Sequence, residues 1–236
     1  GAPVAMLYFA QELERQGYFP VIISPRKGSL LKQCTIPVIV VDDLLENCKF
    51  DIISKLFNIV IVGTIVGAPL INSLMNTGIP TIWWIHEAET SYNVKEWIDK
   101  MPKQLNDNIH VYVVGQYAQK MLKKYRPLYY SQNLLYYIPE ISTEESTRYI
   151  LPDNAKDKTV FALIGLQEYR KGQDILAEAI NRLPIEYLKA SYFIFIGKEC
   201  YKPIKDVIDT LVVNYPQNIL YIEELDKQTL ASLYQD

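Results

Sequence analysis

The chain has 236 residues, of which 49% are hydrophobic and 22% charged, and it carries a formal net charge of −3. This length suits two α/β domains of roughly 100–150 residues each, and the composition is that of an ordinary folded protein. The charge balance excludes the basic surface typical of nucleic-acid binding, and no apolar stretch reaches the ~20 residues that a membrane-spanning helix needs.

Helix and strand patterns alternate along the first 140 residues. After Gly1-Ala2-Pro3, apolar residues at helical spacing predict a helix that Gly17 ends. Short apolar runs predict strands at 21–23, 38–41, 58–62, 81–85, 109–114 and 134–138, and helical spacing predicts helices at 68–76 and 116–124. The strands are apolar on both faces, which is typical of a parallel sheet covered by helices on either side. The repeated strand–helix units therefore predict a doubly wound domain.

The alternation stops after this half and then restarts. Regular apolar spacing fails between Pro139 and Lys158, so we interpret residues 141–157 as a linker between domains. Strands are expected next at 159–164, 192–196 and 219–222, with helices at 172–183, 202–215 and 227–234. We therefore predict one domain over 1–140 and the first part of a second over 158–236, because three strands make a small sheet.

The loop after the strand at 159–164 has the chemistry of an anion site. Ligands of open parallel sheets bind beyond the carboxyl ends of the strands. This loop runs from Gly165 to Gly172 through Arg170 and Lys171, directly before a helix. Free N–H groups at a helix N-terminus favour phosphate, while lysine adds a point charge and arginine a bidentate donor. A solvated basic turn is the alternative interpretation.

Two other loops could face a ligand. His86 follows the strand at 81–85, with Glu87 and Glu89 near enough to perturb its pKa. The alternative is a histidine that hydrogen-bonds to backbone at the end of a strand. Gly1-Ala2 precedes the first helix, where a glycine allows a ligand close to the backbone donors.

The usual cofactor patterns are absent from the sequence. No GxGxxG follows a strand, which argues against a dinucleotide oxidoreductase, and Gln173 stands where a phosphate loop would continue with lysine. Cys34, Cys48 and Cys200 form neither a metal-ligand spacing nor a disulfide framework. We therefore expect no metal and buried thiols in a reducing cytoplasm.

Together, these loops resemble those of the retaining family 4 (group 1) glycosyltransferases. The most specific part is residues 161–184, FALIGLQEYRKGQDILAEAINRLP, which is similar to the family's strand, glycine loop, Lys-Gly pair and following helix. Further similar segments are Gly1-Ala2-Pro3 (small-residue loop), His86-Glu87 (histidine loop), Tyr137-Ile138-Pro139 (Ile-Pro-Asn-Gly segment) and residues 218–234 (strand and helix before the acidic motif).

The resemblance implies an α/β fold of the GT-B type, with two Rossmann-like doubly wound parallel-sheet domains, the second incomplete. The nucleotide-sugar donor would bind mainly to the C-terminal domain and the acceptor mainly to the N-terminal one. The donor diphosphate would be bound by Lys171, Arg170, Gly172 and Gly165. The family implies no cofactor, because the nucleotide sugar is a substrate and protein cations and helix dipoles offset the leaving-group charge.

In the N-terminal domain the resemblance gives His86 a catalytic place near the transferred sugar, with Glu87 beside it in the cleft. Gly1 and Ala2 would contact the acceptor or a phosphate. The implied reaction is hexosyl transfer with retention to a glycan or lipid-linked acceptor, in bacterial cell-surface polysaccharide synthesis. The enzyme would be cytoplasmic and would reach the inner face of the membrane through its acceptor. The sequence does not specify the oligomeric state.

Three features depart from the family pattern. Leu166 stands where the family often has arginine, a role that Arg170 would have to take. Ile138-Pro139-Glu140-Ile141 replaces the Ile-Pro-Asn-Gly segment. The acidic Glu-x7-Glu motif of the family normally lies beyond the place where this chain ends, so we expect a truncated and nearly inactive enzyme. A sugar-nucleotide epimerase of the same architecture and a non-catalytic nucleotide-sugar-binding or scaffold protein are the alternatives.

Overall fold

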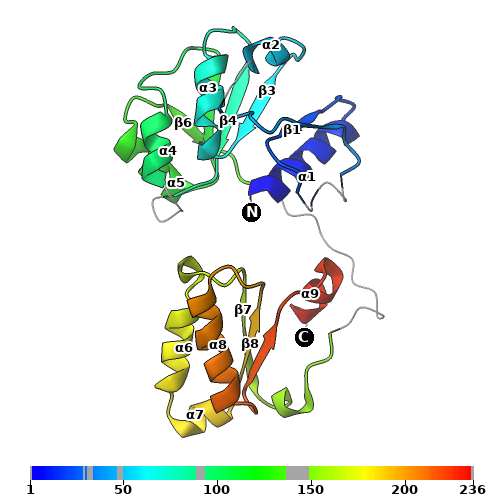
Figure 1. The fold of residues 1–236 in the computed structure, drawn as a ribbon, viewed down its shortest axis with the longest axis vertical. Helices are drawn as coiled ribbons and strands as arrows, with labels where there is room; N and C mark the ends of the chain where they lie inside the picture. The colour runs from blue at the N-terminus through cyan, green and yellow to red at the C-terminus, as the bar shows by residue number, and fades with distance from the viewer. Residues whose placement is uncertain are drawn as a thin grey trace. The chain divides into compact units, whose positions relative to one another are not determined.

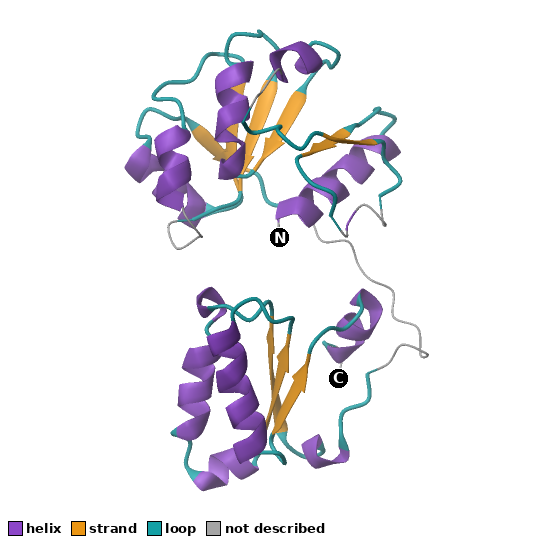
Figure 2. Ribbon diagram, in the orientation of Figure 1, coloured by secondary structure: helices purple, strands orange, loops and turns teal. Residues whose placement is uncertain are grey.

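The computed structural model describes residues 2–28, 30, 34–46, 50–88, 94–136 and 149–234. The chain divides into two compact units, Gly1–Pro139 and Glu140–Asp236, each built from parallel strands and helices (Figures 1 and 2). Several residues singled out in the sequence lie outside the described ranges: Gly1, Cys48, Glu89, the segment 137–140 and residues 141–148 of the expected linker.

The first unit contains two parallel sheets. Its elements are α1 (Ala2–Arg15), β1 (Ile22–Ser24), β2 (Val38–Val40), α2 (Phe50–Ser54), β3 (Val60–Gly63), the 3-10 helix η2 (Ile65–Gly67), α3 (Ala68–Leu74), β4 (Thr81–Ile85), α4 (Val94–Lys100), β5 (Ile109–Val113), α5 (Gln116–Tyr125) and β6 (Ser131–Asn133). Strand β1 pairs with β2, and the second sheet has the order β3-β4-β5-β6.

Strand β4 lies in the interior of the second sheet, between β3 and β5. Its sequence TIWWI is β-branched and aromatic, and its last three side chains are almost completely buried. The buried indoles keep their hydrogen bonds: Trp83 Nε1 donates to the Thr64 carbonyl at 2.8 Å, and Trp84 Nε1 donates to the Leu134 carbonyl at 3.0 Å. These bonds fix the segments that follow β3 and β6.

The second unit has one parallel sheet of order β7-β8-β9. Its elements are the 3-10 helix η4 (Asp153–Ala155), β7 (Thr159–Ile164), the 3-10 helix η5 (Tyr169–Lys171), α6 (Gln173–Asn181), α7 (Ile185–Lys189), β8 (Ser191–Ile196), α8 (Lys202–Asn214), β9 (Ile219–Ile222) and α9 (Lys227–Leu233). All six residues of β8 are buried.

The side chains of β8 alternate between two cores, as the period of a strand requires. Phe193 and Phe195 pack with α6 and α8, which lie together on one face of the sheet (Figure 1). Tyr192 and Ile194 pack in a separate core with Leu230 of α9. Both faces of the sheet are therefore covered, which explains why the strand reads as one continuous apolar run.

Most predicted elements are confirmed to within two residues, but several differ. Helices α2, α4 and α7, of five to seven residues, were not predicted. The strand expected at 134–138 lies earlier, at the polar segment Ser131–Asn133, because pairing with β5 decides its position. The expectation of buried thiols is wrong for Cys200, which is exposed in the loop after β8, and Cys34 is half-buried.

Candidate functional site

His86 lies at the carboxyl end of β4, beside two aromatic rings. Its ring centroid is 4.6 Å from that of Trp84 and 6.1 Å from that of Tyr136, with the latter pair stacked. Its Nε2 atom is buried and has no hydrogen-bond partner among the described residues. Burial lowers the pKa of His86 to about 4. The imidazole is therefore neutral at pH 7, with one nitrogen left for a ligand.

Glu87 is engaged by the backbone rather than free. Its Oε2 accepts hydrogen bonds from the N–H of Ile65 at 2.8 Å and from the N–H of His86 at 3.1 Å. Burial raises the pKa of the Glu87 carboxyl, and these backbone bonds partly oppose that rise. The carboxylate thus joins the loop after β4 to the first turn of η2. In this structure Glu87 positions His86 rather than pointing freely at a ligand.

Thr64 is a feature that the sequence did not reveal. It follows β3 with φ 73° and ψ 158°, a region of backbone conformation that is otherwise almost restricted to glycine. Its N–H donates to the Trp84 carbonyl at 2.8 Å, and its hydroxyl accepts from the N–H of Val66 at 3.0 Å. Such strain is typical of functional loops, and it lies next to the residue pair His86 and Glu87.

Helix α1 lies against the same strand ends. Ala2 is its first residue, and Gly1 lies outside the described residues. A Cβ atom at Gly63 would lie 2.9 Å from the Cγ and Sδ atoms of Met6, so α1 approaches β3 closely at this glycine. Phe9 of α1 contacts Trp84 edge-on, with ring centroids 5.7 Å apart. Phe9 in the middle of α1 and His86 are therefore parts of one aromatic cluster centred on Trp84.

In the second unit, the glycine loop after β7 brings three of the predicted residues together. Gly165 and Gly172 have φ values of +153° and +75°, which allow the loop to turn into α6. The Lys171 side chain lies over Gly165: its Cδ and Cε are 3.4 Å from where a Cβ on that glycine would be. In the described parts of the chain no partner binds the Lys171 ammonium. Lys171 precedes α6, whose first N–H groups lack intrahelical partners, by two positions.

Arg170 behaves differently from Lys171. Its guanidinium forms an ion pair with the Glu168 carboxylate at 2.5 Å, and the Glu168 side chain is only 16% exposed. Of the two cations predicted to bind the diphosphate, Arg170 is therefore already paired within the loop. The expectation that Arg170 takes the place of the family arginine remains a prediction, since the guanidinium would first have to leave its partner.

Two buried glutamines fix this loop, and sequence reasoning missed both. Gln167 donates to the Gly197 carbonyl at 2.9 Å, and Gln173 donates to the Leu166 carbonyl at 2.9 Å. Each is 1% exposed, and its buried Oε1 has no hydrogen-bond partner among the residues that the structure describes. Glutamine is usually a surface residue, so nothing in the local pattern could have found them. Their carbonyl oxygens are free to accept hydrogen bonds from water or a ligand.

The described residues place no three His, Cys, Asp or Glu side chains where they could hold a metal ion. No helix in the described parts of the chain is long and apolar enough to cross a membrane.

Known glycosyltransferases are similar to this chain in sequence and in structure. A family model for glycosyltransferase family 4 matches residues 1–125, which is more than half of the chain. No curated protein matches the sequence. WaaG, a glycosyltransferase involved in lipopolysaccharide biosynthesis, is similar in structure with a TM-score of 0.54 at 10% identity, over 97% of this chain and 67% of that chain.

MurG of Acinetobacter baumannii is similar with a TM-score of 0.52 at 14% identity, over 96% of this chain and 64% of that chain. The chain thus spans about two thirds of the length of each structure. Similarity at this level of identity concerns the fold, and it confirms the predicted α/β class of the GT-B type. Since the family model covers residues 1–125, the chain belongs to glycosyltransferase family 4.

Proposed function

We propose that this chain forms part of an enzyme that transfers a hexosyl group from a nucleotide sugar, with retention, to a glycan or lipid-linked acceptor. Membership of glycosyltransferase family 4 supports the reaction class. The similarity to WaaG, which is involved in lipopolysaccharide biosynthesis, supports a role in building a cell-surface polysaccharide. The proposal places the enzyme in the cytoplasm, at the membrane face that carries its acceptor.

One observation carries the proposal: the unpartnered Lys171 ammonium, which lies over Gly165 at the start of α6. A diphosphate placed there would meet a full positive charge, free backbone N–H groups and the positive end of the helix dipole. When the sugar departs, negative charge grows on that diphosphate, and a fixed cation stabilises it without a metal ion. The glycine at position 165 leaves room for the aliphatic part of the Lys171 side chain close to the backbone.

His86 supplies the second part of the proposal. Because its pKa is lowered to about 4, the imidazole is neutral at physiological pH and brings no additional positive charge. Its buried Nε2 lacks a partner among the described residues, and a sugar hydroxyl would satisfy it. Glu87 would act through the backbone of His86, as a positioning residue.

Calorimetric titration with UDP, GDP and ADP, in the presence of a metal chelator, tests the proposal. One of them should bind, and Lys171→Ala should weaken that binding by roughly 1–3 kcal/mol, the range for a charged hydrogen bond. Lys189→Ala is the matched control, because it removes the same charge at the amino end of β8. Equal affinities of the wild type and Lys171→Ala would remove Lys171 from the site, and binding only with added metal would contradict metal-free stabilisation.

Product analysis separates the alternatives. A transferase releases nucleoside diphosphate in step with glycosylation of an acceptor, whereas an epimerase converts the nucleotide sugar without an acceptor. A non-catalytic binder retains the diphosphate affinity and does neither.

A further inference from the structure

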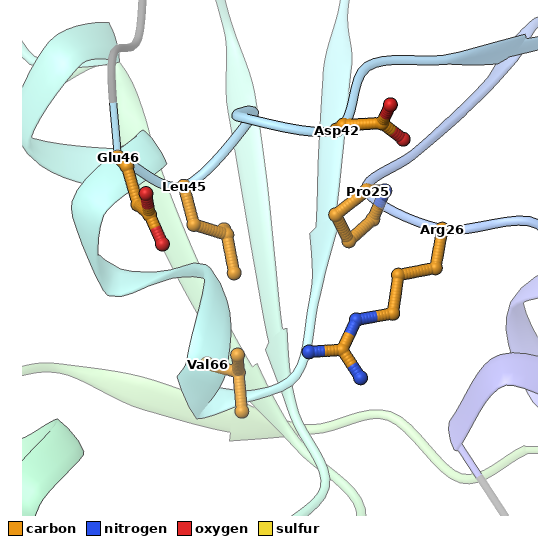
Figure 3. Close-up of a pocket in the computed structure, with 6 residues that line it drawn as sticks. All are labelled: Pro25, Arg26, Asp42, Leu45, Glu46 and Val66. Carbon is orange, nitrogen blue, oxygen red and sulfur yellow. The ribbon is translucent and has the colours of Figure 1, made fainter.

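Each unit contains a cavity. The cavity of the first unit, between Arg26 and Glu46, lies at the carboxyl ends of β1, β2 and β3 (Figure 3), where ligands of parallel sheets bind. It belongs to the end of the sheet that the proposed function already uses. The cavity of the second unit has a volume of about 520 Å³, within the range of small-molecule sites, and lies at the other end of its sheet.

The cavity of the second unit is formed by segments that precede the three strands. Lys158 lies directly before β7, part of α7 lies before β8, and residues 214–218 connect α8 to β9. Figure 1 shows α7 at the end of the sheet away from the loop after β7. The length of β8, about 20 Å, separates the two ends. A ligand in this cavity would therefore not touch the diphosphate loop.

One part of the lining is apolar, formed by Ile185, Leu188, Pro216 and the ring of Tyr215. Leu188 is buried and Tyr215 is partly buried, and both pack in the core that covers one face of the sheet, so their positions are fixed. Ile185 is 61% exposed, which is high for a large apolar side chain. An apolar ligand that covered Ile185 would remove this surface from water.

The backbone carbonyls around the cavity already accept hydrogen bonds. The side-chain amide of Asn218 donates to the Leu188 carbonyl at 2.7 Å and to the Ser191 carbonyl at 2.9 Å. The Tyr215 carbonyl accepts from the N–H of Asn218 at 2.9 Å and from the N–H of Ile219 at 3.0 Å. A ligand is therefore not needed as a hydrogen-bond donor to these carbonyls.

Two lysines, in contrast, offer donors that lack a carboxylate. The Nζ atom of Lys158 donates to the Gln217 carbonyl at 2.8 Å, which fixes the ammonium at the cavity and leaves its other N–H groups available. Lys189, the last residue of α7, is exposed. Neither lysine forms an ion pair within the part of the chain that the structure describes. The neighbouring acidic residues, Asp157 and Glu186, do not line the cavity.

The apolar surface and the two positive charges together define a ligand class. A carboxylate would form charge-assisted hydrogen bonds with the ammonium groups, while an aliphatic chain would cover Ile185 and Leu188. A cation would be repelled by both lysines, and inorganic phosphate would leave the apolar lining in water. We propose that this cavity binds a small aliphatic carboxylate, at a site separate from that of the nucleoside diphosphate. The inference does not depend on the transferase function.

NMR titration of isotope-labelled protein with hexanoate, hexanol, hexylammonium and acetate tests the assignment. Hexanoate should bind most tightly and should shift the amide signals of residues 185–189 and 214–218. Acetate should bind about tenfold more weakly or worse, because it lacks four methylene groups. Hexanol should also bind more weakly, because it lacks the charge, and hexylammonium should not bind.

Variants separate the contributions of charge and apolar surface. Lys158→Met should weaken hexanoate binding about tenfold, as loss of a charged hydrogen bond does. Ile185→Ser should weaken it as well, and its exposed position favours retention of the fold. Lys156→Met is the matched control, because Lys156 is paired with Asp153 at 2.7 Å and does not line the cavity. Circular dichroism verifies that each variant is folded.

Several results would overturn the assignment: no binding of hexanoate, binding of hexylammonium or acetate as tight as that of hexanoate, or unchanged hexanoate affinity in Lys158→Met. If Lys158→Met does not fold, Lys189→Met and Ile185→Ser decide, and unchanged affinity in both would overturn it. A nucleoside diphosphate should bind equally well with and without saturating hexanoate. Competition between the two would place hexanoate in the diphosphate loop and would also overturn the assignment.

Discussion

The Glu87 carboxylate accepts a hydrogen bond of 2.8 Å from the backbone N–H of Ile65, 22 positions earlier in the chain. This bond joins the segments that follow two neighbouring strands, β3 and β4. Because the same oxygen also accepts from the His86 N–H, it fixes the backbone of the candidate catalytic residue. The Glu87 carboxylate therefore fixes the position of His86 and does not itself act on a ligand.

Replacing Glu87 by alanine should destabilise the first unit by about 2 kcal/mol, because two backbone donors lose their partner at a half-buried site. Glu87→Gln keeps an acceptor oxygen and should lose much less. Chemical denaturation of both variants measures the difference. Equal losses for the two would show that the charge, and not the hydrogen bonds, is what stabilises the segment.

The pH dependence of stability should report the ionisation of Glu87. Burial raises its pKa above the ordinary 4.5, so the folded protein holds this proton more tightly than the unfolded chain. The corresponding stability is fully present below about pH 4.5 and is lost as the pH rises through the folded-state pKa. Subtracting the profile of Glu87→Gln from that of the wild type should isolate this fall. A flat difference would contradict the raised pKa.

The ionisation of His86 should change the stability with pH in the opposite direction to that of Glu87, over a similar pH range. Its pKa is lowered from 6.5 to about 4, so the folded protein binds this proton less tightly than the unfolded chain. Stability from the neutral form is therefore present above about pH 6.5 and lost as the pH falls toward 4. NMR titration of the ring should show one midpoint near 4, with the other histidine signal assigned through His110→Gln. A His86 midpoint near 6.5 would mean that the ring is open to solvent.

The two strand-end regions show which structural features the sequence alone predicts. The apolar run of β8 and the tryptophans of β4 predicted buried parallel strands, because strand period and burial are local properties. The sequence also placed the two glycines and Lys171 in one loop after β7, because close backbone approach and a cation before a helix depend on neighbouring residues. Local patterns were sufficient for these features.

Other features depend on contacts between distant positions, which one sequence does not show. The role of Glu87 depends on Ile65, 22 residues away, and that of Gln167 on Gly197, 30 residues away. The strained conformation of Thr64 has no signal in its residue type, because threonine rarely adopts a positive φ. The ion pair between Arg170 and Glu168 is local, but the sequence does not show which of several nearby charged residues Arg170 pairs with.

That engagement predicts unequal effects at two adjacent cations. Arg170→Ala should change nucleoside diphosphate affinity by less than about 0.5 kcal/mol, because the guanidinium is already paired with Glu168. Glu168→Gln should release Arg170 and tighten the binding of the diphosphate. Calorimetry on these two variants and on Lys171→Ala ranks the three by their affinity for the nucleoside diphosphate. A loss at Arg170→Ala as large as that at Lys171→Ala would show that the arginine leaves Glu168 to contact the ligand.

The contact between Gly165 and Gly197 gives a test of how the loop after β7 keeps its conformation. A Cβ atom at position 197 would lie 1.9 Å from the Gly165 carbonyl oxygen, and φ there is +150°. Gly197→Ala should therefore destabilise the second unit by about 3 kcal/mol, and it should weaken diphosphate binding because the loop after β7 must move. Gly172→Ala is the matched comparison: its φ is +75°, but its Cβ would meet only Ile175 at 3.9 Å. Strain alone should cost that variant about 1 kcal/mol, so equal destabilisation of the two would mean that the loops after β7 and β8 are not in contact.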